Sequence, residues 1–151
     1  MQAAPDLQGR VVLVTGSARR TGRMIAHKFA EAGASLVINA RSAAAEAESV
    51  AKEIEAKHGK GRAFAHVADV CDAAAVDAMI ARTVATYGRL DVLVNNAAIF
   101  ATLNKRPFDQ IPLDEWEQVL RINITGVFNC VCAVAPAMRK TGWGRIINIS
   151  S

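Results

Sequence analysis

The stretch VTGSARRTGR, residues 14–23, joins a run of apolar residues to an alanine-rich segment of helical character. Gly16 and Gly22 frame the turn between them, and Arg19 and Arg20 lie inside it. A turn from a strand into a helix can bind phosphate, because the first N–H groups of the helix lack partners and carry the positive end of its dipole. The stretch is neither a G-x-G-x-x-G fingerprint nor a Walker A loop. Its spacing alone is therefore equally compatible with a tight structural turn.

Apolar runs alternate with helical stretches along the whole chain. The runs are VVLVT (11–15), SLVINA (35–40), RAFAHV (62–67), DVLVNN (91–96) and RIINIS (145–150). Runs that are nearly continuous in Val, Ile and Leu are typical of strands buried on both faces of a parallel sheet. Right-handed crossovers then predict an α/β fold, a doubly wound parallel sheet with helices on both faces. No linker or repeat interrupts the pattern, so residues 1–151 are predicted to form a single domain.

An apolar stripe at spacings of three and four residues predicts one long helix in the second half of the chain. The stripe consists of Trp116, Val119, Leu120, Asn123, Val127, Val131, Val134 and Met138. Pro136 is expected to kink or end this helix. An asparagine on such a stripe needs a hydrogen-bonding partner, so the residues alone favour a structural role for Asn123.

Composition and charge narrow the possible function. The chain has 151 residues and a formal net charge of +4, with its basic residues scattered among acids apart from Arg19, Arg20 and Arg23. This distribution favours local anion binding over a nucleic-acid interface. We expect a cytoplasmic protein, because no leader pattern opens the chain and no segment is expected to reach the roughly 18 apolar residues that span a bilayer. The cysteines and histidines lack ligand spacing, so no metal site is predicted.

The end of the second apolar run carries the signal for cofactor choice. An NAD-specific fold places an acidic residue about 20 positions beyond the glycine turn, where it binds the ribose 2′-hydroxyl. Residues 39–42 are Asn-Ala-Arg-Ser and contain no carboxylate. The guanidinium of Arg41 would instead bind a 2′-phosphate bidentately, and Arg19 or Arg20 could approach the same phosphate from the glycine turn. The sequence thus favours NADP over an assignment of these arginines to solvated surface.

Short motifs also occur in a fixed order along essentially the whole chain. They are Thr15-Gly16 with Gly22, Asp69-Val70, Asn95-Asn96-Ala97-Ala98, Asn123-Ile124-Thr125-Gly126 and Asn148-Ile149-Ser150-Ser151. In order and spacing they resemble the short-chain dehydrogenases/reductases. The resemblance implies a Rossmann-type fold whose C-terminal strands are missing from this sequence. Arg20 replaces the family's second loop glycine, as in pteridine reductases, and Ala98 replaces a usual glycine, which leaves the substrate subgroup open.

The resemblance also implies roles for individual residues at the cofactor. Asp69 and Val70 are expected near the adenine, with Asn96, Ala97 and Ala98 along the adenosine ribose. By its position alone, Asp69 could equally cap the helix that begins near Ala73. The residues expected to bind the cofactor are Gly16, Ser17, Arg19, Arg20, Thr21, Gly22, Arg41, Ser42, Asp69, Val70, Asn96, Ala97 and Ala98.

Two catalytic residues follow from the resemblance, which also implies that Asn95 braces the central sheet. The main chain of Asn123 is expected to hold a water of the proton relay, and Ser151 to hydrogen-bond the substrate oxygen. The family's Tyr-x-x-x-Lys pair normally follows the serine by about a dozen residues, and this sequence stops at Ser151. Its only tyrosine, Tyr87, has an aspartate four positions on and cannot substitute. The chain is therefore expected to be inactive by itself, as the N-terminal part of a longer reductase.

The activity implied is hydride transfer between NADPH and a carbonyl or alcohol, on a 3-oxoacyl-thioester-like or small ketone substrate. A pterin substrate is the minority alternative, and a noncatalytic NADP-binding module or a nucleic-acid binder are alternatives of other classes. The family commonly pairs the long helix, here around residues 114–138, across a subunit interface. A homodimer or homotetramer is therefore expected, with exposed apolar surface on that helix.

Overall fold

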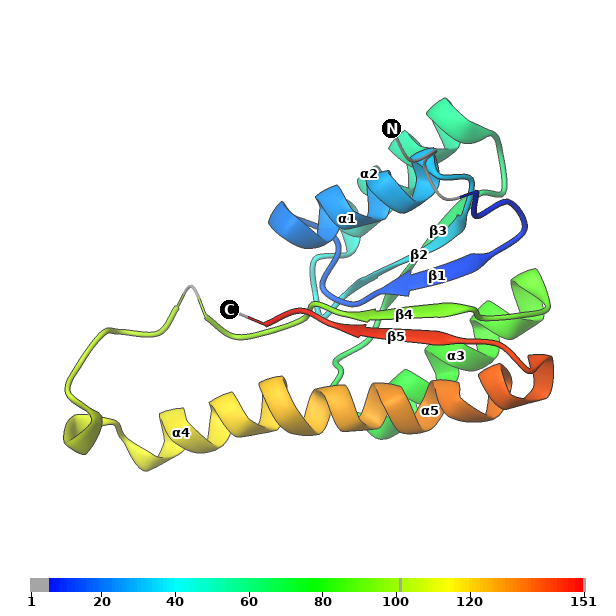
Figure 1. Ribbon diagram of the computed structural model, residues 1–151. Coiled ribbons are helices and arrows are strands. Elements are labelled where there is room, and N and C mark those ends of the chain that lie inside the picture. The colour runs from blue at the N-terminus through cyan, green and yellow to red at the C-terminus, as the bar shows by residue number, and fades with distance from the viewer. Residues whose placement is uncertain (1–5, 101, 151) are drawn as a thin grey trace, which may run out of the picture.

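A parallel sheet lies at the centre of the computed structural model, which describes residues 6–100 and 102–150 (Figure 1). Its strands are β1 (Val11–Val14), β2 (Ser35–Ala40), β3 (Ala63–Val67), β4 (Val92–Asn95) and β5 (Arg145–Asn148). The five strands lie in the order β3-β2-β1-β4-β5, and every neighbouring pair is parallel. Each predicted apolar run contains one strand, so the predicted doubly wound parallel sheet is confirmed.

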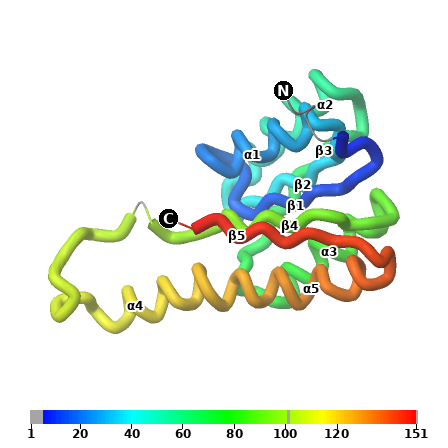
Figure 2. Tube along the Cα trace, in the orientation of Figure 1, coloured from blue at the N-terminus to red at the C-terminus, as the bar shows by residue number. Residues whose placement is uncertain are grey.

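Helices cover both faces of the sheet (Figures 1 and 2). The helices α1 (Arg20–Glu31) and α2 (Ala44–His58) lie on one face, and α3 (Ala73–Tyr87) and α5 (Gly126–Thr141) lie on the other. In β1, Val12 and Val14 join the core beneath α1 and α2, whereas Val11 and Leu13 join the core beneath α3 and α5. This double burial explains why the β1 run is apolar without alternation.

The strand order reverses next to β1, which pairs with β2 on one side and β4 on the other. In open α/β sheets, ligands bind outside the carboxyl ends of the strands at this reversal point. The turn of residues 15–19 leaves β1 there, and the segment of residues 96–100 leaves β4 beside it. The two segments therefore frame the place where a site is expected.

One continuous helical segment runs from Leu113 to Thr141. It consists of α4 (Leu113–Leu120), the π-helical turn η2 (Arg121–Thr125) and α5, and the short 3₁₀ turn η1 (Phe108–Gln110) precedes it. The predicted apolar stripe is buried only in part, because α4 projects beyond the sheet (Figure 1). Val134 and Met138 are buried, whereas Trp116 and Leu120 are 51% and 41% exposed.

Pro136 was expected to kink or end the helix. It does not end the helix, which continues to Thr141. A proline has no backbone N–H to donate to the carbonyl four residues earlier, here that of Cys132. Both Pro136 and Cys132 are exposed, so water can reach the released carbonyl. The departure from regular α-helix lies instead at the π-helical turn η2.

The same segment corrects the expectation that no part of the chain is apolar enough to cross a bilayer. An 18-residue window within Leu113–Thr141 has a mean hydropathy of 1.5, at most two charged residues, and 17% of its residues buried. The expectation failed because the many Val, Ile, Ala and Cys residues outweigh the few asparagines in the mean. Core helices of water-soluble proteins meet the same criterion, so this property alone does not place the chain in a membrane.

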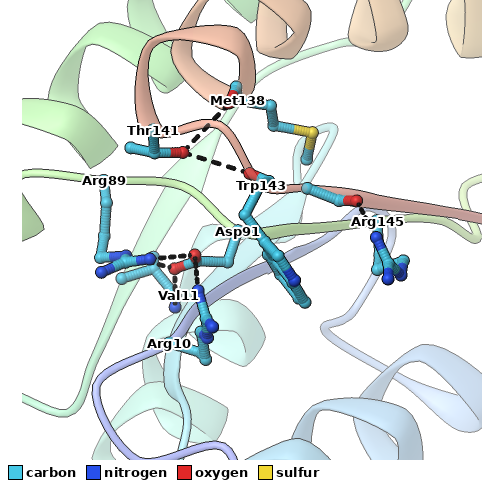
Figure 3. A network of polar contacts seen from close by, with 9 residues as sticks. Arg10, Val11, Arg89, Asp91, Met138, Thr141, Trp143 and Arg145 are labelled. Atoms are coloured by element: carbon cyan, nitrogen blue, oxygen red, sulfur yellow. Dashed lines mark hydrogen bonds and ion pairs between the residues drawn. The ribbon is translucent and has the colours of Figure 1, made fainter.

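At the opposite edge of the sheet, the carboxylate of Asp91 is fully buried just before β4 (Figure 3). Arg10 Nη1 donates to its Oδ1 at 2.9 Å, and Arg89 donates from Nε and Nη2 at 2.7 and 2.6 Å. The Val11 N–H donates to Oδ2 at 2.9 Å. Burial alone would raise the pKa of Asp91, but these hydrogen bonds outweigh it and lower the pKa. Asp91 thus ties the start of β1 to the start of β4.

Replacing this carboxylate should make the protein less stable and less sensitive to acid. We expect Asp91→Asn to lower the free energy of unfolding at pH 7 by about 2 to 3 kcal/mol, because two arginines lose their counter-charge. The folded-state pKa lies below the unfolded value of about 3.9, so the contribution is complete above that value and is lost as the pH falls through the folded pKa. Urea unfolding at a series of acidic pH values measures both effects.

The matched control is Asp77→Asn, at an exposed position on α3. We expect the control to keep the acid dependence of the wild type, and Asp91→Asn to flatten it. Equal pH slopes for wild type and Asp91→Asn would contradict the assignment.

Candidate functional site

Thr15 holds the turn after β1 against the segment that leaves β4. Its hydroxyl oxygen accepts the N–H groups of Asn96 and Ala97, both at 3.0 Å, and its hydroxyl donates to the Val94 carbonyl at 3.3 Å. In return, Asn96 Nδ2 donates to the carbonyls of Thr15 and Gly16 at 2.9 and 3.1 Å. The side chain of Asn96, which the sequence assigned to the cofactor, therefore clamps the turn from the other side.

Two glycines allow the backbone segments of this turn to approach closely. Gly16 has φ +63°, and a Cβ added there would lie 2.9 Å from the Cα of Ala97. A Cβ added to Gly22 would lie 2.5 Å from the Gly16 carbonyl oxygen and 2.5 Å from Asn96 Nδ2. A larger residue at either position would displace the turn. The two glycines that framed the sequence motif are thus required by packing.

Asn39 supports the turn from β2, a role that the sequence analysis missed. The side chain is buried, and its Oδ1 accepts the N–H of Gly16 at 3.2 Å. Its Nδ2 donates to the carbonyls of Ala68 and His66 at 3.0 and 3.3 Å. The signal was an amide at the end of the apolar run SLVINA, since a buried amide must find partners. Asn39 therefore connects the ends of β1, β2 and β3.

Ser17 is fully buried, although the sequence analysis placed it among the residues that bind the cofactor. Its hydroxyl donates to the Val14 carbonyl at 2.7 Å and accepts the N–H of Asn39 at 3.1 Å. Its own N–H donates to the Asn39 carbonyl at 2.8 Å. The side chain of Ser17 faces the interior, so it can influence a ligand only through the shape of the turn.

The N-terminus of α1 faces the same edge without a side-chain cap. Its N-cap residue, Arg19, makes no capping hydrogen bond, and the first turn contains no acidic residue. The first N–H groups of the helix lack intrahelical partners and attract anions. Arg20 has φ +49°, the left-handed conformation that glycine adopts at no cost, which fits its place at a loop position where the family has glycine.

Several expected cofactor contacts are exposed at the carboxyl edge of the sheet. These are Arg19, Arg20, Thr21, Arg41, Ser42 and Ala98. The guanidinium of Arg19 forms an ion pair with Glu46 of α2. The residues that end β2, Asn39 and Ala40, are buried and carry no charge, and the exposed Arg41 is the first charged residue after them.

The segment after β3 places Asp69 and Val70 beside this edge. Asp69 Oδ1 accepts the N–H of Cys71 at 2.9 Å. The N-cap of α3 is Asp72, whose side chain accepts the N–H of Ala75 at 3.1 Å, so the alternative reading of Asp69 as the helix cap is wrong. Asp69 lies too early in the chain to cap the helix, because α3 starts only after a further turn, which Asp69 itself stabilises. Val70 is buried.

Asn123 lies in the π-helical turn η2 and binds the segment after β4. Its Oδ1 accepts the N–H of Ile99 at 2.9 Å, and its Nδ2 donates to the Ile99 carbonyl at 3.3 Å. The structural partner expected of a helical asparagine is therefore present. The water-holding role of its main chain stays a prediction, and the predicted catalytic residue Ser151 lies outside the described residues.

Asn95 and Tyr87 agree with the expectations for them. Asn95 Nδ2 donates to Asn148 Oδ1 at 2.9 Å and so links β4 to β5. Tyr87 ends α3 and stacks on Phe64 with ring centroids 5.7 Å apart. Burial, with Glu55 adding to it, raises the pKa of Tyr87 to about 12. Since α3 runs back from the carboxyl edge, Tyr87 lies away from the candidate site and cannot donate a proton there.

Comparison with known proteins gives the same picture as the motifs. The family model described as short chain dehydrogenase matches residues 10–151. The 3-oxoacyl-[acyl-carrier-protein] reductase FabG of Staphylococcus aureus is 44% identical over 140 residues, which are 92% of this chain and 54% of that protein. The (2S)-[(R)-hydroxy(phenyl)methyl]succinyl-CoA dehydrogenase subunit BbsD of Thauera aromatica is 38% identical over 146 residues, covering 96% of this chain and 56% of that protein.

A similar fold is found in a gluconate 5-dehydrogenase from Burkholderia cenocepacia, solved in complex with NADP and tartrate. The two structures superpose with a TM-score of 0.86 at 41% identity, over 96% of this chain and 55% of that one. The chain thus spans about half the length of the relatives that it matches. Together with the glycine turn and the asparagine motifs, these matches show that the chain belongs to the short chain dehydrogenase family.

Proposed function

We propose that this chain forms the NADP-binding part of an oxidoreductase that transfers hydride between NADPH and a carbonyl or alcohol. The observation that carries the proposal is the pairing of an uncapped α1 N-terminus with exposed arginines, at a sheet edge where β2 ends without a carboxylate. The binding of NADP by the similar gluconate 5-dehydrogenase supports it.

The glycine turn suits the pyrophosphate of a dinucleotide. Gly16 and Gly22 let the turn pack closely against Ala97 and Asn96, and the first N–H groups of α1 attract an anion. Ala97 and Ala98 follow β4 on the other side of the reversal point, and their small side chains leave room for a ribose. These residues therefore fit the group that the family binds.

The 2′-phosphate is proposed to lie against the turn after β2. Arg41 and Ser42 are exposed there and offer a guanidinium and a hydroxyl, and Arg19 reaches the neighbouring α2 from the glycine turn. In NAD-specific folds, an acidic residue near this position binds the ribose hydroxyl and would repel a phosphate. Asn39 is uncharged, and its amide is buried and bonded to Gly16, so it does not repel a phosphate here.

Catalysis is proposed to involve Asn123 and Ser151 together with a proton donor outside this sequence. NADPH, when bound, supplies the hydride. Ser151 would donate a hydrogen bond to the substrate oxygen, and Asn123 would hold a water through its main chain. The names of the FabG and BbsD relatives favour a 3-oxoacyl-thioester-like substrate, with a small ketone as the related choice. The second candidate is a pterin substrate, because Arg20, with φ +49°, replaces the second loop glycine in a way that resembles pteridine reductases.

We also propose that the complete protein lies in the cytoplasm and that its subunits assemble through the long helix. Large apolar side chains recur every four residues along the helix and are exposed at Trp116, Leu120, Ile124 and Phe128. A face of this kind favours a homodimer or homotetramer of the complete protein.

Cofactor preference tests the role of Arg41. In the complete protein, Arg41→Ala should weaken the binding of NADPH by about 1 to 3 kcal/mol, because a charge-assisted hydrogen bond to phosphate is lost. NADH binding should change little, and Arg139→Ala, an exposed arginine in the last turn of α5, should change neither affinity. Fluorescence titration with both cofactors measures this. Equal losses of affinity for NADPH and NADH would show that Arg41 does not bind the 2′-phosphate and is an ordinary solvated surface residue.

The proton donor gives a second test. We expect residues 1–151 alone to show no NADPH-dependent ketone reduction, because their only tyrosine has a pKa of about 12 and lies away from the site. We also expect low solubility, since Ile146, Ile147 and Ile149 are 40%, 40% and 45% exposed on and beside β5. A chain extended through a downstream Tyr-x-x-x-Lys pair should be soluble and active. Comparable turnover by the two forms would refute the assignment of the proton donor.

A further inference from the structure

An open pocket of about 330 Å³ lies between α1 and α2, beside the place proposed for the 2′-phosphate. Three arginines line it, Arg19, Arg20 and Arg23, and two carboxylates face them, Glu46 and Glu53. The carboxylates come from α2 and have different partners. The pairing of each carboxylate therefore affects how the pocket would bind a phosphate.

Glu46 is already paired with one of these arginines, Arg19. Arg19 Nη2 donates to Glu46 Oε1, and this hydrogen bond is the main cause of the lowered pKa of Glu46, followed by a bond to its own backbone N–H. Glu46 lies in the first turn of α2, where the helix dipole also favours an anion. The carboxylate therefore combines the guanidinium of the glycine turn with the N-terminus of α2.

We infer that Glu46 is a specificity-determining residue, whose carboxylate competes with the 2′-phosphate of the cofactor for Arg19 and thereby reduces the preference for NADP over NAD. The inference rests on the proposed function, since it needs a 2′-phosphate beside Arg19 and Arg41. NAD has a hydroxyl in place of this phosphate. Its affinity should therefore not depend on Glu46.

The exposure of the pair sets the size of the effect. The side chains of Arg19 and Glu46 are 64% and 44% exposed. Ion pairs between exposed side chains are weak and are screened by salt, so a phosphate can displace the carboxylate. Displacement breaks the pair and leaves Glu46 as a negative charge beside the phosphate. Both consequences lower the affinity for NADPH, and removal of the carboxylate should restore it.

Glu53 differs in its contacts, although it lines the same pocket. Its Oε2 accepts Arg23 Nη2 at 2.5 Å and lies 3.2 Å from His27 Nε2, and Ser49 Oγ donates to its Oε1 at 3.3 Å. None of these partners belongs to the turn that precedes α1. Glu53 therefore links α1 to α2 and provides a control for the loss of a negative charge within the pocket.

The test measures dissociation constants for NADPH, NADH and 2′-AMP in the complete protein. We expect Glu46→Gln to lower the Kd of NADPH about two- to fivefold at low salt, with the gain reduced at high salt. The Kd of 2′-AMP should fall in parallel, and that of NADH should stay constant. Glu53→Gln and Glu48→Gln, an exposed neighbour on α2, are the charge-matched controls. Neither should change the ratio of the NADPH and NADH constants as Glu46→Gln does.

A second variant ties the effect to Arg19. In an Arg19→Ala background, Glu46→Gln should improve NADPH binding less than in the wild type, because the competition for the guanidinium is absent and only the repulsion between carboxylate and phosphate remains. An unchanged or higher Kd of NADPH for Glu46→Gln in the wild-type background would overturn the inference, even if the wild type prefers NADPH. A wild type that binds neither NADPH nor 2′-AMP would overturn the proposed function and the inference together.

Discussion

The turn after β1 has to bury backbone polar groups next to the end of β4, and the hydrogen bonds of Thr15 make this possible. Its hydroxyl accepts two consecutive N–H groups, those of Asn96 and Ala97, while Asn96 returns hydrogen bonds to the carbonyls of Thr15 and Gly16. Because buried polar groups without partners are costly, this exchange fixes where the turn lies. The glycines then follow as a requirement, since the segments are too close for a Cβ.

The way these bonds are shared explains why the edge can receive a ligand. Asn39 and Ser17 satisfy the turn from beneath, with both side chains buried. No side chain caps α1, so the first N–H groups of that helix remain directed at the reversal point of the sheet. The charged residues, Arg19 and Arg41, are left outside this network and are exposed. Uncharged groups thus hold the turn in place, and the charged side chains lie at the surface.

The sequence predicted the strands well, because burial on both faces leaves a continuous apolar run that needs no knowledge of partners. It predicted poorly whatever depends on contacts distant in the chain. Asn39 bonds to Gly16 and Ala68, and Asp91 to Arg10, and nothing local in the sequence announces either pair. The apolar stripe of the long helix was recognised, but periodicity cannot tell whether the same chain covers it, and α4 is exposed around Trp116. Asp69 and Asp72 both suit a helix cap by type, and only the turn geometry assigns the cap to Asp72.

The hydrogen bonds of Thr15 hold the turn in its binding shape before any ligand arrives. Amide hydrogen exchange of Asn96 and Ala97 in the ligand-free protein tests this most directly, with Thr15→Val as the variant of similar shape that lacks the hydroxyl. We expect strong protection of both N–H groups in the wild type and a rise in their exchange rates of about tenfold or more in Thr15→Val. Core amides of β2, such as that of Val37, should be much less affected. Fast exchange of Asn96 and Ala97 in the wild type, or rates unchanged by the substitution, would contradict this role of Thr15.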